Sequence, residues 1–338
     1  MAEENATRKC KQDTCTVSLD GKCLEGLDPD KCPHHFYLQS SEDVNSTIEA
    51  STTTTDSNKF IPLFGGLAFS SKDVSLITYK AFCEKIFIIG ESGSGKTTFL
   101  ATIFDSFQKG PINDIHFAGS YTQIGFEERC HLSRLISKAA VPDTEKTSTM
   151  EFKFLHLAVK KSSGLNKPSI HFLISDISGE RLRSARDSSS AMQELNLLKT
   201  SSDIIYMIDG EKLSNRTTRQ STIFKTDTFI QRSLDDEILG SGTDFKIVVS
   251  KWDMLYQDNK FDFEVEIVNH FKEKFGSRFS SISFAKIAAR PKKADTEIKY
   301  GYGVFELLNE WIEKSLIRNV KRDVDQKIRG DRFFDNFK

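Results

Sequence analysis

Apolar residues in the central part of the chain follow two periods that alternate along the sequence. Short apolar runs bounded by turn residues are typical of buried strands, and they occupy 85–89, 150–159, 170–175, 203–208, 245–250 and 282–288. Helical periodicity predicts helices near 97–107, 127–139, 189–198, 217–239, 262–275 and 304–317. This alternation predicts an α/β fold with a mostly parallel sheet and helices on both faces.

Two segments depart from the simple alternation. The strands at 150–159 and 170–175 are separated by a turn at 163–166, so we expect them to pair in an antiparallel way. Some forty residues after the first helix show no clear strand pattern. Residues 60–69 are apolar but too short to span a bilayer, and we expect them to pack on the domain that follows.

The chain ends differ in composition from the centre. Residues 1–36 are rich in cysteine and show no helix or strand period, and 40–58 are polar and rich in Ser and Thr. We therefore expect a cysteine-rich module at 1–38, a flexible linker at 39–59, the main domain at 60–320 and a charged tail at 321–338. The tail is expected either to continue the last helix or to dock elsewhere.

Composition and charge exclude some function classes. The 338 residues are 38% hydrophobic and 28% charged, with a net charge of −1, so we expect no broad nucleic-acid or membrane footprint. The sequence has no apolar run near the length of a membrane span, and its polar N-terminus lacks a signal-peptide core. We expect a cytoplasmic protein without a transmembrane segment.

A glycine-rich turn follows the first predicted strand and leads into the first predicted helix. Its pattern, G-x-x-x-x-G-K-T, lets backbone N–H groups point at phosphate oxygens, with a helix N-terminus at the same place. Lys96 is expected to reach the β- and γ-phosphates, and the Thr97 hydroxyl to bind Mg²⁺. The predicted phosphate-binding residues are Gly90, Glu91, Ser92, Gly93, Ser94, Gly95, Lys96, Thr97 and Thr98.

The next candidate residues follow the strand at 170–175. Ligands of open α/β sheets bind at the carboxyl ends of strands, and Asp176 and Gly179 stand at such an end. The Asp176 carboxylate can hold Mg²⁺ through water. The Gly179 amide can sense a γ-phosphate, because glycine allows close backbone approach.

A third group of residues, Ser250-Lys251-Trp252-Asp253, follows the strand at 245–250. The Asp253 carboxylate can accept hydrogen bonds from guanine N1–H and the exocyclic amine, and the Lys251 stem can cover the base. A charged loop without ligand is the alternative. After the last strand, the Ala289 amide is expected to meet the guanine carbonyl; Phe284-Ala285-Lys286 is a competing placement inside that strand.

These motifs, in this order and spacing, resemble those of TRAFAC-class P-loop GTPases, the group that includes Ras-like proteins, over residues 80–318. The resemblance implies a six-stranded sheet with one antiparallel strand, and a switch that is on with GTP, off with GDP and slow in hydrolysis. The cysteine-rich head, linker and long first switch resemble bacterial GTPases of conflict or defence systems, including the double-GTPase type. That resemblance implies a protein effector or co-encoded partner that contacts the switch segments.

The resemblance also implies roles for individual residues. Thr147 is similar to the first-switch threonine that binds Mg²⁺ together with Thr97 and Asp176; Thr144 and Thr149 are fallbacks, and a solvated Ser/Thr turn is the alternative. The residues implied to act in hydrolysis are Lys96, Thr147, Gly179 and Glu180.

The sequence departs from the family pattern at several positions. Ser250 stands where Asn or Thr is usual, and Ala288 where Ser is common. Glu180 stands where Ras-like enzymes have a glutamine that orients water, and a carboxylate cannot donate an amide hydrogen bond. We expect three nearby arginines to be solvated or partner-facing charges, with internal arginine fingers as the alternative: Arg181, Arg183 and Arg186.

The cysteine-rich head predicts a structural Zn²⁺ site. Four thiolates suit tetrahedral zinc, and so short a segment needs a metal to fold; the ligands would be Cys10, Cys15, Cys23 and Cys32. His34 or His35 could replace one cysteine. Disulfides or unligated thiols are the alternatives.

Taken together, the sequence predicts a switch that binds and hydrolyses GTP with Mg²⁺ and carries a zinc module. Two alternatives stay open. One is a P-loop ATPase, because the same glycine-rich pattern occurs in ATP-binding proteins, although no acidic catalytic pair follows a strand. The other is a nucleotide-dependent scaffold with little hydrolysis, which Glu180 motivates.

Overall fold

The computed structural model describes residues 7–10, 35–38, 65–131, 152–256, 261–292 and 297–329. The chain divides into two compact units, Met1–Ile61 and Pro62–Lys338. In the first unit, strands β1 (Thr7–Cys10) and β2 (His35–Leu38) pair in an antiparallel way, with Cys10 opposite His35. We expected no strand there; that expectation was wrong, because β1 carries charged residues and no apolar alternation.

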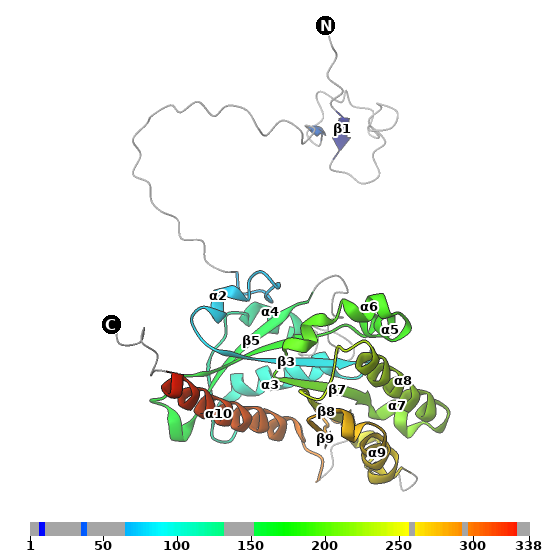
Figure 1. The fold of residues 1–338 in the computed structure, drawn as a ribbon. Coiled ribbons are helices and arrows are strands. Elements are labelled where there is room, and N and C mark those ends of the chain that lie inside the picture. Colours follow the sequence, from blue (N-terminus) through cyan, green and yellow to red (C-terminus); the bar gives the residue numbers. More distant parts are fainter. Residues whose placement is uncertain are drawn as a thin grey trace, which may run out of the picture. The chain divides into compact units, whose positions relative to one another are not determined.

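The second unit contains a seven-stranded sheet with the strand order β4-β5-β6-β3-β7-β8-β9 (Figure 1). Strand β5 is antiparallel to both of its neighbours, β4 and β6, and the remaining neighbours are parallel. The strand bounds are β3 Cys83–Gly90, β4 Ile115–Gly119, β5 Phe154–Lys161, β6 Ile170–Asp176, β7 Asp203–Asp209, β8 Asp244–Ser250 and β9 Ser281–Lys286.

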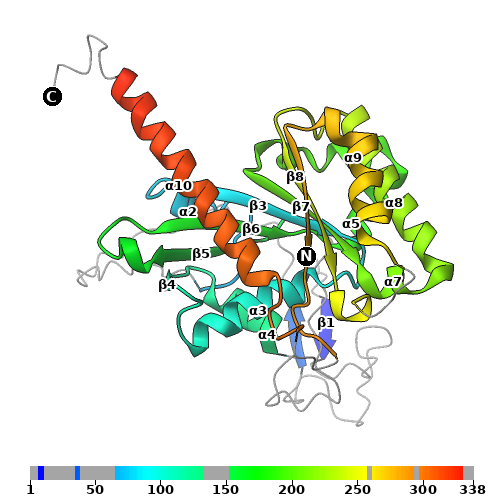
Figure 2. The same ribbon diagram turned by 90° about the horizontal axis from the view of Figure 1, so that it is seen from below.

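Helices cover both faces of this sheet (Figure 2). One face carries α3 (Lys96–Lys109), α4 (Gln123–His131) and α10 (Val304–Arg329). The other carries α2 (Ser75–Thr78), α5 (Gly179–Asp187), α6 (Ser189–Gln193), α7 (Gly210–Ser214), α8 (Arg216–Asp235), the π-helix η6 (Glu264–Asn269) and α9 (His270–Phe275). Short 3₁₀ turns lie at η3 (Ser162–Gly164), η4 (Asn196–Thr200), η5 (Trp252–Met254) and η7 (Gly276–Arg278).

The central strand β3 shows why the fold needs continuous apolar runs. Ile86 and Ile88 enter the core under α3 and α10, whereas Phe87 and Ile89 enter the core under α5 and α8. A strand buried on both faces cannot alternate apolar with polar residues. The run at 85–89 therefore marks the centre of the sheet.

The six predicted strands and the antiparallel pair are confirmed, but the predicted strand count of six is wrong. The seventh strand, β4, lies in the segment where we expected none. It is an edge strand of five residues in which only Ile115 is fully buried, so its sequence carries little periodic signal. The structure places β4 beside β5, at one end of the sheet.

The predicted helices differ from the observed ones mainly at their ends. Helix α8 ends at Asp235, the segment at 262–275 begins as a π-helix, and α10 continues to Arg329. Phe69, at the end of the apolar segment 60–69, is buried and pairs with Phe154, as expected. The linker at 39–59 lies outside the described residues, as do residues 132–139 of the helix predicted at 127–139.

Candidate functional site

The strand order brings the candidate residues to one edge of the sheet (Figure 1). Strands β3, β6, β7, β8 and β9 are parallel, so their carboxyl ends lie at the same edge. In the register, Ile88 lies opposite Asp176, and Asp209 lies opposite Ser250. This edge therefore holds the ends of all the predicted motifs that the structure describes.

The glycine-rich turn after β3 requires its glycines. Gly90, Gly93 and Gly95 have φ values of 155°, 80° and 86°, which L-residues with a side chain rarely adopt. A Cβ on Gly90 would lie 2.5 Å from the Met207 carbonyl oxygen. Gly95 then caps the start of α3 in the left-handed conformation.

Lys96 lies inside this turn. Its side chain is buried, and Nζ donates to the Gly90 carbonyl at 2.8 Å and to the Glu91 carbonyl at 3.2 Å. Thr97 and Thr98 follow in the first turn of α3 and are half-buried. A buried ammonium that donates to two carbonyl oxygens is placed to donate to phosphate oxygens as well. The Ser94 hydroxyl is buried without a partner among the described residues.

Helix α5 begins against the glycine-rich turn at 90–98, which is called the phosphate loop from here on. Its first residue is Gly179, and a Cβ there would overlap with the Ser92 backbone nitrogen, so glycine is required. Ser178 caps the helix by accepting from the Arg181 amide at 3.3 Å. Glu180 is exposed. The end of β6 and the start of α5 thus lie directly beside the predicted phosphate site.

The three arginines of α5 have different surroundings. Arg183 is exposed, as expected. Arg181 places its guanidinium 4.1 Å from the Phe152 ring centre and donates to the Glu194 carbonyl. Arg186 is buried and forms an ion pair with Glu91 of the phosphate loop. The expectation of a solvated charge was therefore wrong for Arg186, because a carboxylate 95 residues earlier compensates it.

The residues after β8 lie against the phosphate loop. Ser250 is buried, donates to the Ile208 carbonyl at 3.1 Å and lies 3.8 Å from where a Gly95 Cβ would be. Lys251 is left-handed, with φ 48°, and its Nζ lies 3.0 Å from Asp209 and 2.9 Å from Glu211. Burial lowers the pKa of Lys251, but the two carboxylates outweigh it and the pKa is raised.

Asp253 faces the loop that follows β9. Its Oδ2 accepts from the Lys292 amide at 3.0 Å, and Lys292 Nζ lies 3.0 Å from Glu211. Hydrogen bonds from Lys251 and Lys292 lower the pKa of Glu211. The Ala288 amide donates to the Tyr302 carbonyl, whereas the Ala289 amide has no acceptor within the described part of the chain. The Asp253 carboxylate and the Ala289 amide thus lie at the same edge of the sheet.

Sequence reasoning missed the carboxylates and the lysine that hold the residues after β8 in place. Asp209, Glu211 and Lys292 were not among the predicted site residues. A usable signal exists for Asp209, because Asp209-Gly210 ends an apolar strand just as Asp176 does. A Cβ on Gly210 would overlap with the Ser250 carbonyl oxygen, so this glycine lets β7 and β8 end close together.

The two predicted metal sites differ in what the structure describes. Mg²⁺ prefers oxygen ligands, and the Thr97 hydroxyl and Asp176 carboxylate, from neighbouring elements, supply only oxygen; the residue types fit. Thr147, with Thr144 and Thr149, lies outside the described residues, as do Cys15, Cys23 and Cys32 of the predicted zinc site. Within the described ranges, no group of three or more His, Cys, Asp or Glu residues is arranged to hold a metal.

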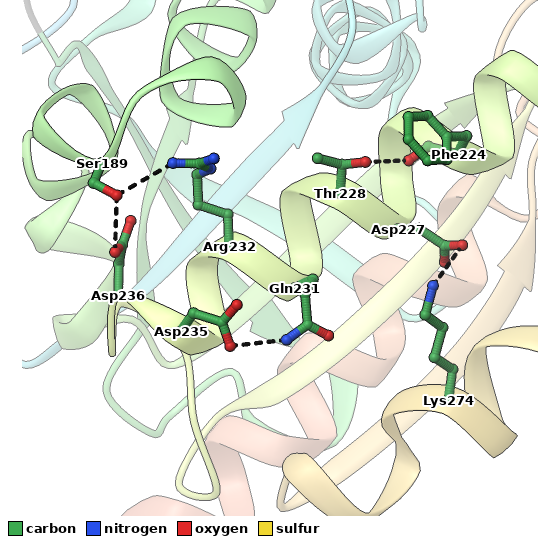
Figure 3. Close-up of a pocket in the computed structure, with 9 residues that line it drawn as sticks. All are labelled: Ser189, Phe224, Asp227, Thr228, Gln231, Arg232, Asp235, Asp236 and Lys274. Carbon is green, nitrogen blue, oxygen red and sulfur yellow. Dashed lines mark hydrogen bonds and ion pairs between the residues drawn. The ribbon is translucent and has the colours of Figure 1, made fainter.

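A pocket of about 390 Å³ lies away from the strand ends, between α6, α8 and α9 (Figure 3). Here Ser189 donates to Asp236 at 3.1 Å and accepts from Arg232 at 3.2 Å. Its lining residues are Ser189, Phe224, Asp227, Thr228, Gln231, Arg232, Asp235, Asp236 and Lys274. None of the predicted nucleotide-binding residues lines it, so this pocket is separate from the predicted site.

A comparison with protein-family models agrees with the motifs. A sequence model of a family described as Double-GTPase 2 matches residues 84–312, and no curated protein matches the chain. Similar solved structures include the signal recognition particle receptor SRb-GTP/SRX complex from Chaetomium thermophilum (16% identity, 64% of this chain and 95% of that chain, TM-score 0.37). Another is a putative nucleolar GTP-binding protein 1 from Plasmodium falciparum (12%, 73% and 93%, 0.40).

A third similar structure is the Ski7 GTPase-like domain of S. cerevisiae bound to GTP (12% identity, 72% of this chain and 52% of that chain, TM-score 0.39). The TM-scores of these three structures are low, so the family assignment rests on the sequence match over 84–312. Among the described residues, no helix is both long and apolar enough to cross a membrane.

Proposed function

Because the chain belongs to the Double-GTPase 2 family, we propose that it is a molecular switch that binds GTP with Mg²⁺ and hydrolyses it to GDP and phosphate. The observation that carries the proposal is the position of Ser250 and Asp253. Ser250 packs against Gly95 of the phosphate loop, and Asp253 presents a carboxylate beside the loop after β9. The residues proposed to bind phosphate and those proposed to bind guanine thus share one edge of the sheet, which supports the proposal.

In this proposal, the phosphate loop from Gly90 to Thr98 binds the phosphates and Lys96 neutralises them. Thr97, Asp176 and the first-switch Thr147 would hold Mg²⁺, which supplies a positive charge to the phosphate oxygens when bound. Lys251, Asp253 and the Ala289 amide would bind the guanine base. Gly179 would contact the γ-phosphate, since the start of α5 lies against Ser92.

Hydrolysis is proposed to be slow. Glu180 is exposed next to Gly179, and a carboxylate can accept but not donate a hydrogen bond to water. The same observation supports a second candidate, a nucleotide-dependent scaffold with little hydrolysis. Phosphate release over many turnovers separates the two: a rate no higher than that of Lys96→Ala would favour the scaffold.

The remaining parts of the proposal concern the setting of the switch. We propose a protein effector, read through the switch segments, in a conflict or defence system of the bacterial type, and a cytoplasmic location. The cysteine-rich head at 1–38 is proposed as a Zn²⁺ module joined by the linker at 39–59 to the GTPase domain at 60–320, with a tail at 321–338. These parts rest on sequence resemblance and composition.

Calorimetric titration of the full chain with GDP, a GTP analogue and an ATP analogue in Mg²⁺ tests the proposal. We expect strong guanine preference, and we expect Lys96→Ala to lower nucleotide affinity by more than about a hundredfold, because a charge-assisted phosphate contact is lost. Equal or better ATP binding would move the protein to the P-loop ATPases. Unchanged affinity in Lys96→Ala would refute the phosphate-loop assignment.

A further inference from the structure

One ion pair joins the phosphate loop to the helix that follows the predicted γ-phosphate contact. Glu91 comes directly after β3, and Arg186 lies in the last turn of α5, seven residues after Gly179. Their side chains are 21% and 10% exposed, and Arg186 Nη1 donates to Glu91 Oε1. Because the pair is largely shielded from water, screening by solvent and salt weakens it less than it weakens an exposed pair.

Helix α5 therefore contacts the phosphate loop at both of its ends. At the first turn, the Gly179 backbone packs on Ser92; at the last turn, Arg186 holds Glu91. The segment beyond α5 is bound in turn to the end of α8, since Ser189 of α6 donates to Asp236 at 3.1 Å (Figure 3). Gln193 also donates to the Asp236 carbonyl, at 3.0 Å. A shift of α5 along the loop would require the Glu91–Arg186 pair to break.

The position of Gly179 is the part of this arrangement that a γ-phosphate would sense. Discrimination between GTP and GDP needs groups that contact the γ-phosphate, and the Gly179 amide is the proposed group of this kind outside the phosphate loop. Such a group has to be held in place before the ligand arrives, because a loosely placed donor pays an ordering cost on binding. In this structure the ion pair supplies that restraint at the far end of the helix.

We propose that Arg186 is a positioning residue for γ-phosphate recognition: through Glu91 it fixes α5 on the phosphate loop, and it thereby sets the preference of the site for GTP over GDP. This inference rests on the proposed function. It assigns Arg186 no contact with the nucleotide, in contrast to an arginine finger, and it gives Glu91 a role that the glycine-rich pattern does not require.

The test compares GTP-analogue and GDP affinities of Arg186→Met with those of Arg183→Met, which removes the same charge from the exposed side of the same helix. We expect the ratio of GTP to GDP affinity to fall about tenfold in Arg186→Met, a typical coupling between two parts of one site, with GDP affinity within about twofold of wild type. Arg183→Met should keep the wild-type ratio. A ratio in Arg186→Met equal to that of Arg183→Met would overturn the inference.

The double variant Glu91→Gln/Arg186→Met separates positioning from charge compensation and guards against misfolding, because it leaves no unpaired buried charge. The low ratio should persist, since the tie between α5 and the loop is still absent. Recovery of the wild-type ratio would show that Arg186 only neutralises Glu91. If wild type itself binds no guanine nucleotide, the proposed function fails. If wild type prefers GTP over ATP but Arg186→Met and Arg183→Met have the same ratio of GTP to GDP affinity, only the positioning role fails.

Discussion

At the amino-terminal edge of the sheet, α10 brings Lys314 and Arg318 against the first residues of β3, β7 and β8. Arg318 Nη1 lies 3.1 Å from Glu84 and 3.0 Å from Asp203, and Nη2 lies 3.3 Å from Asp244; Lys314 also contacts Asp203, at 2.6 Å. At the carboxyl-terminal edge, by contrast, Lys96 is held by two carbonyl oxygens and Asp253 accepts from one backbone amide.

The difference lies in what could replace each contact. Glu84 and Asp203 at the amino-terminal edge are buried and share Arg318, so losing this partner leaves charge that water hardly reaches. At the carboxyl-terminal edge, the carbonyl oxygens that Lys96 contacts and the amide that Asp253 contacts carry no charge, so a ligand that displaces them leaves no unpaired buried charge. We therefore expect changes at the amino-terminal edge to lower stability and, under the proposed function, changes at the carboxyl-terminal edge to lower nucleotide affinity.

The largest loss of stability is expected from Arg318→Met, at the amino-terminal edge. The change removes the cation that Glu84 and Asp203 share, while Asp203 keeps Lys314, and we expect the free energy of unfolding to fall by about 3 kcal/mol, at the low end for a broken buried pair because 26% of the Arg318 side chain is exposed. GDP affinity should stay unchanged. Urea denaturation and calorimetry measure the two quantities.

Arg216→Met, at an exposed position at the start of α8, is the matched control and should change stability by less than about 0.5 kcal/mol. A loss below about 1 kcal/mol in Arg318→Met, or a parallel loss of GDP affinity, would contradict the division between the two edges.

A second prediction concerns the loss of stability at acidic pH, which we attribute to two histidines that lie between the two edges of the sheet. His156 on β5 accepts from the Tyr121 amide through Nδ1 at 3.0 Å, so its Nε2 carries the hydrogen and donates to His171 Nδ1 at 3.0 Å. Burial, and then the neighbouring His171, lower the pKa of His156 from 6.5 to about 4. Burial also lowers the pKa of His171.

The sign follows from these directions. The unfolded chain takes up the His156 proton at a higher pH than the folded chain, so stability is lost as the pH falls from 6.5 to about 4, by up to about 3 kcal/mol. His156→Gln should flatten this part of the pH dependence, whereas His131→Gln, at an exposed position on α4, should not. Urea denaturation at about pH 7 and about pH 4.5 measures the difference; equal slopes for wild type and His156→Gln would refute the assignment.

The positions of the central strands and the edge that carries the site could be predicted because both depend on local sequence. Each central strand is a continuous apolar run, and each run ends in a glycine or a charged residue whose place follows from the topology. Strand β4 could not be predicted in this way, since an edge strand buries little and Ile115 alone gives no period.

The charge pairs that shape the site could not be predicted, because they join residues far apart in the sequence. Glu91 and Arg186 are 95 residues apart, and Lys251 and Asp209 are 42 apart. In the sequence, Arg186 looks like Arg183, a charge on an amphipathic helix; only the packing of α5 on the phosphate loop distinguishes them. The same holds for Glu211 and Lys292, which meet only because the β7 and β9 loops share an edge.

The smallest change in the free energy of unfolding is expected from Asp253→Asn, which is also the sharpest test of the carboxyl-terminal edge. The amide oxygen can still accept from the Lys292 amide, so stability should stay within about 0.5 kcal/mol of wild type. Guanine, however, offers two donors, and an amide presents one acceptor and one donor. We expect GTP affinity to fall about thirtyfold, or about 2 kcal/mol, while ATP affinity stays unchanged. Asp235→Asn on α8, the same change away from the strand ends, should leave both affinities unchanged. Calorimetry with both nucleotides gives the result, and a GTP-to-ATP ratio equal to that of wild type would remove Asp253 from the base site and leave it as a partner of the Lys292 loop alone.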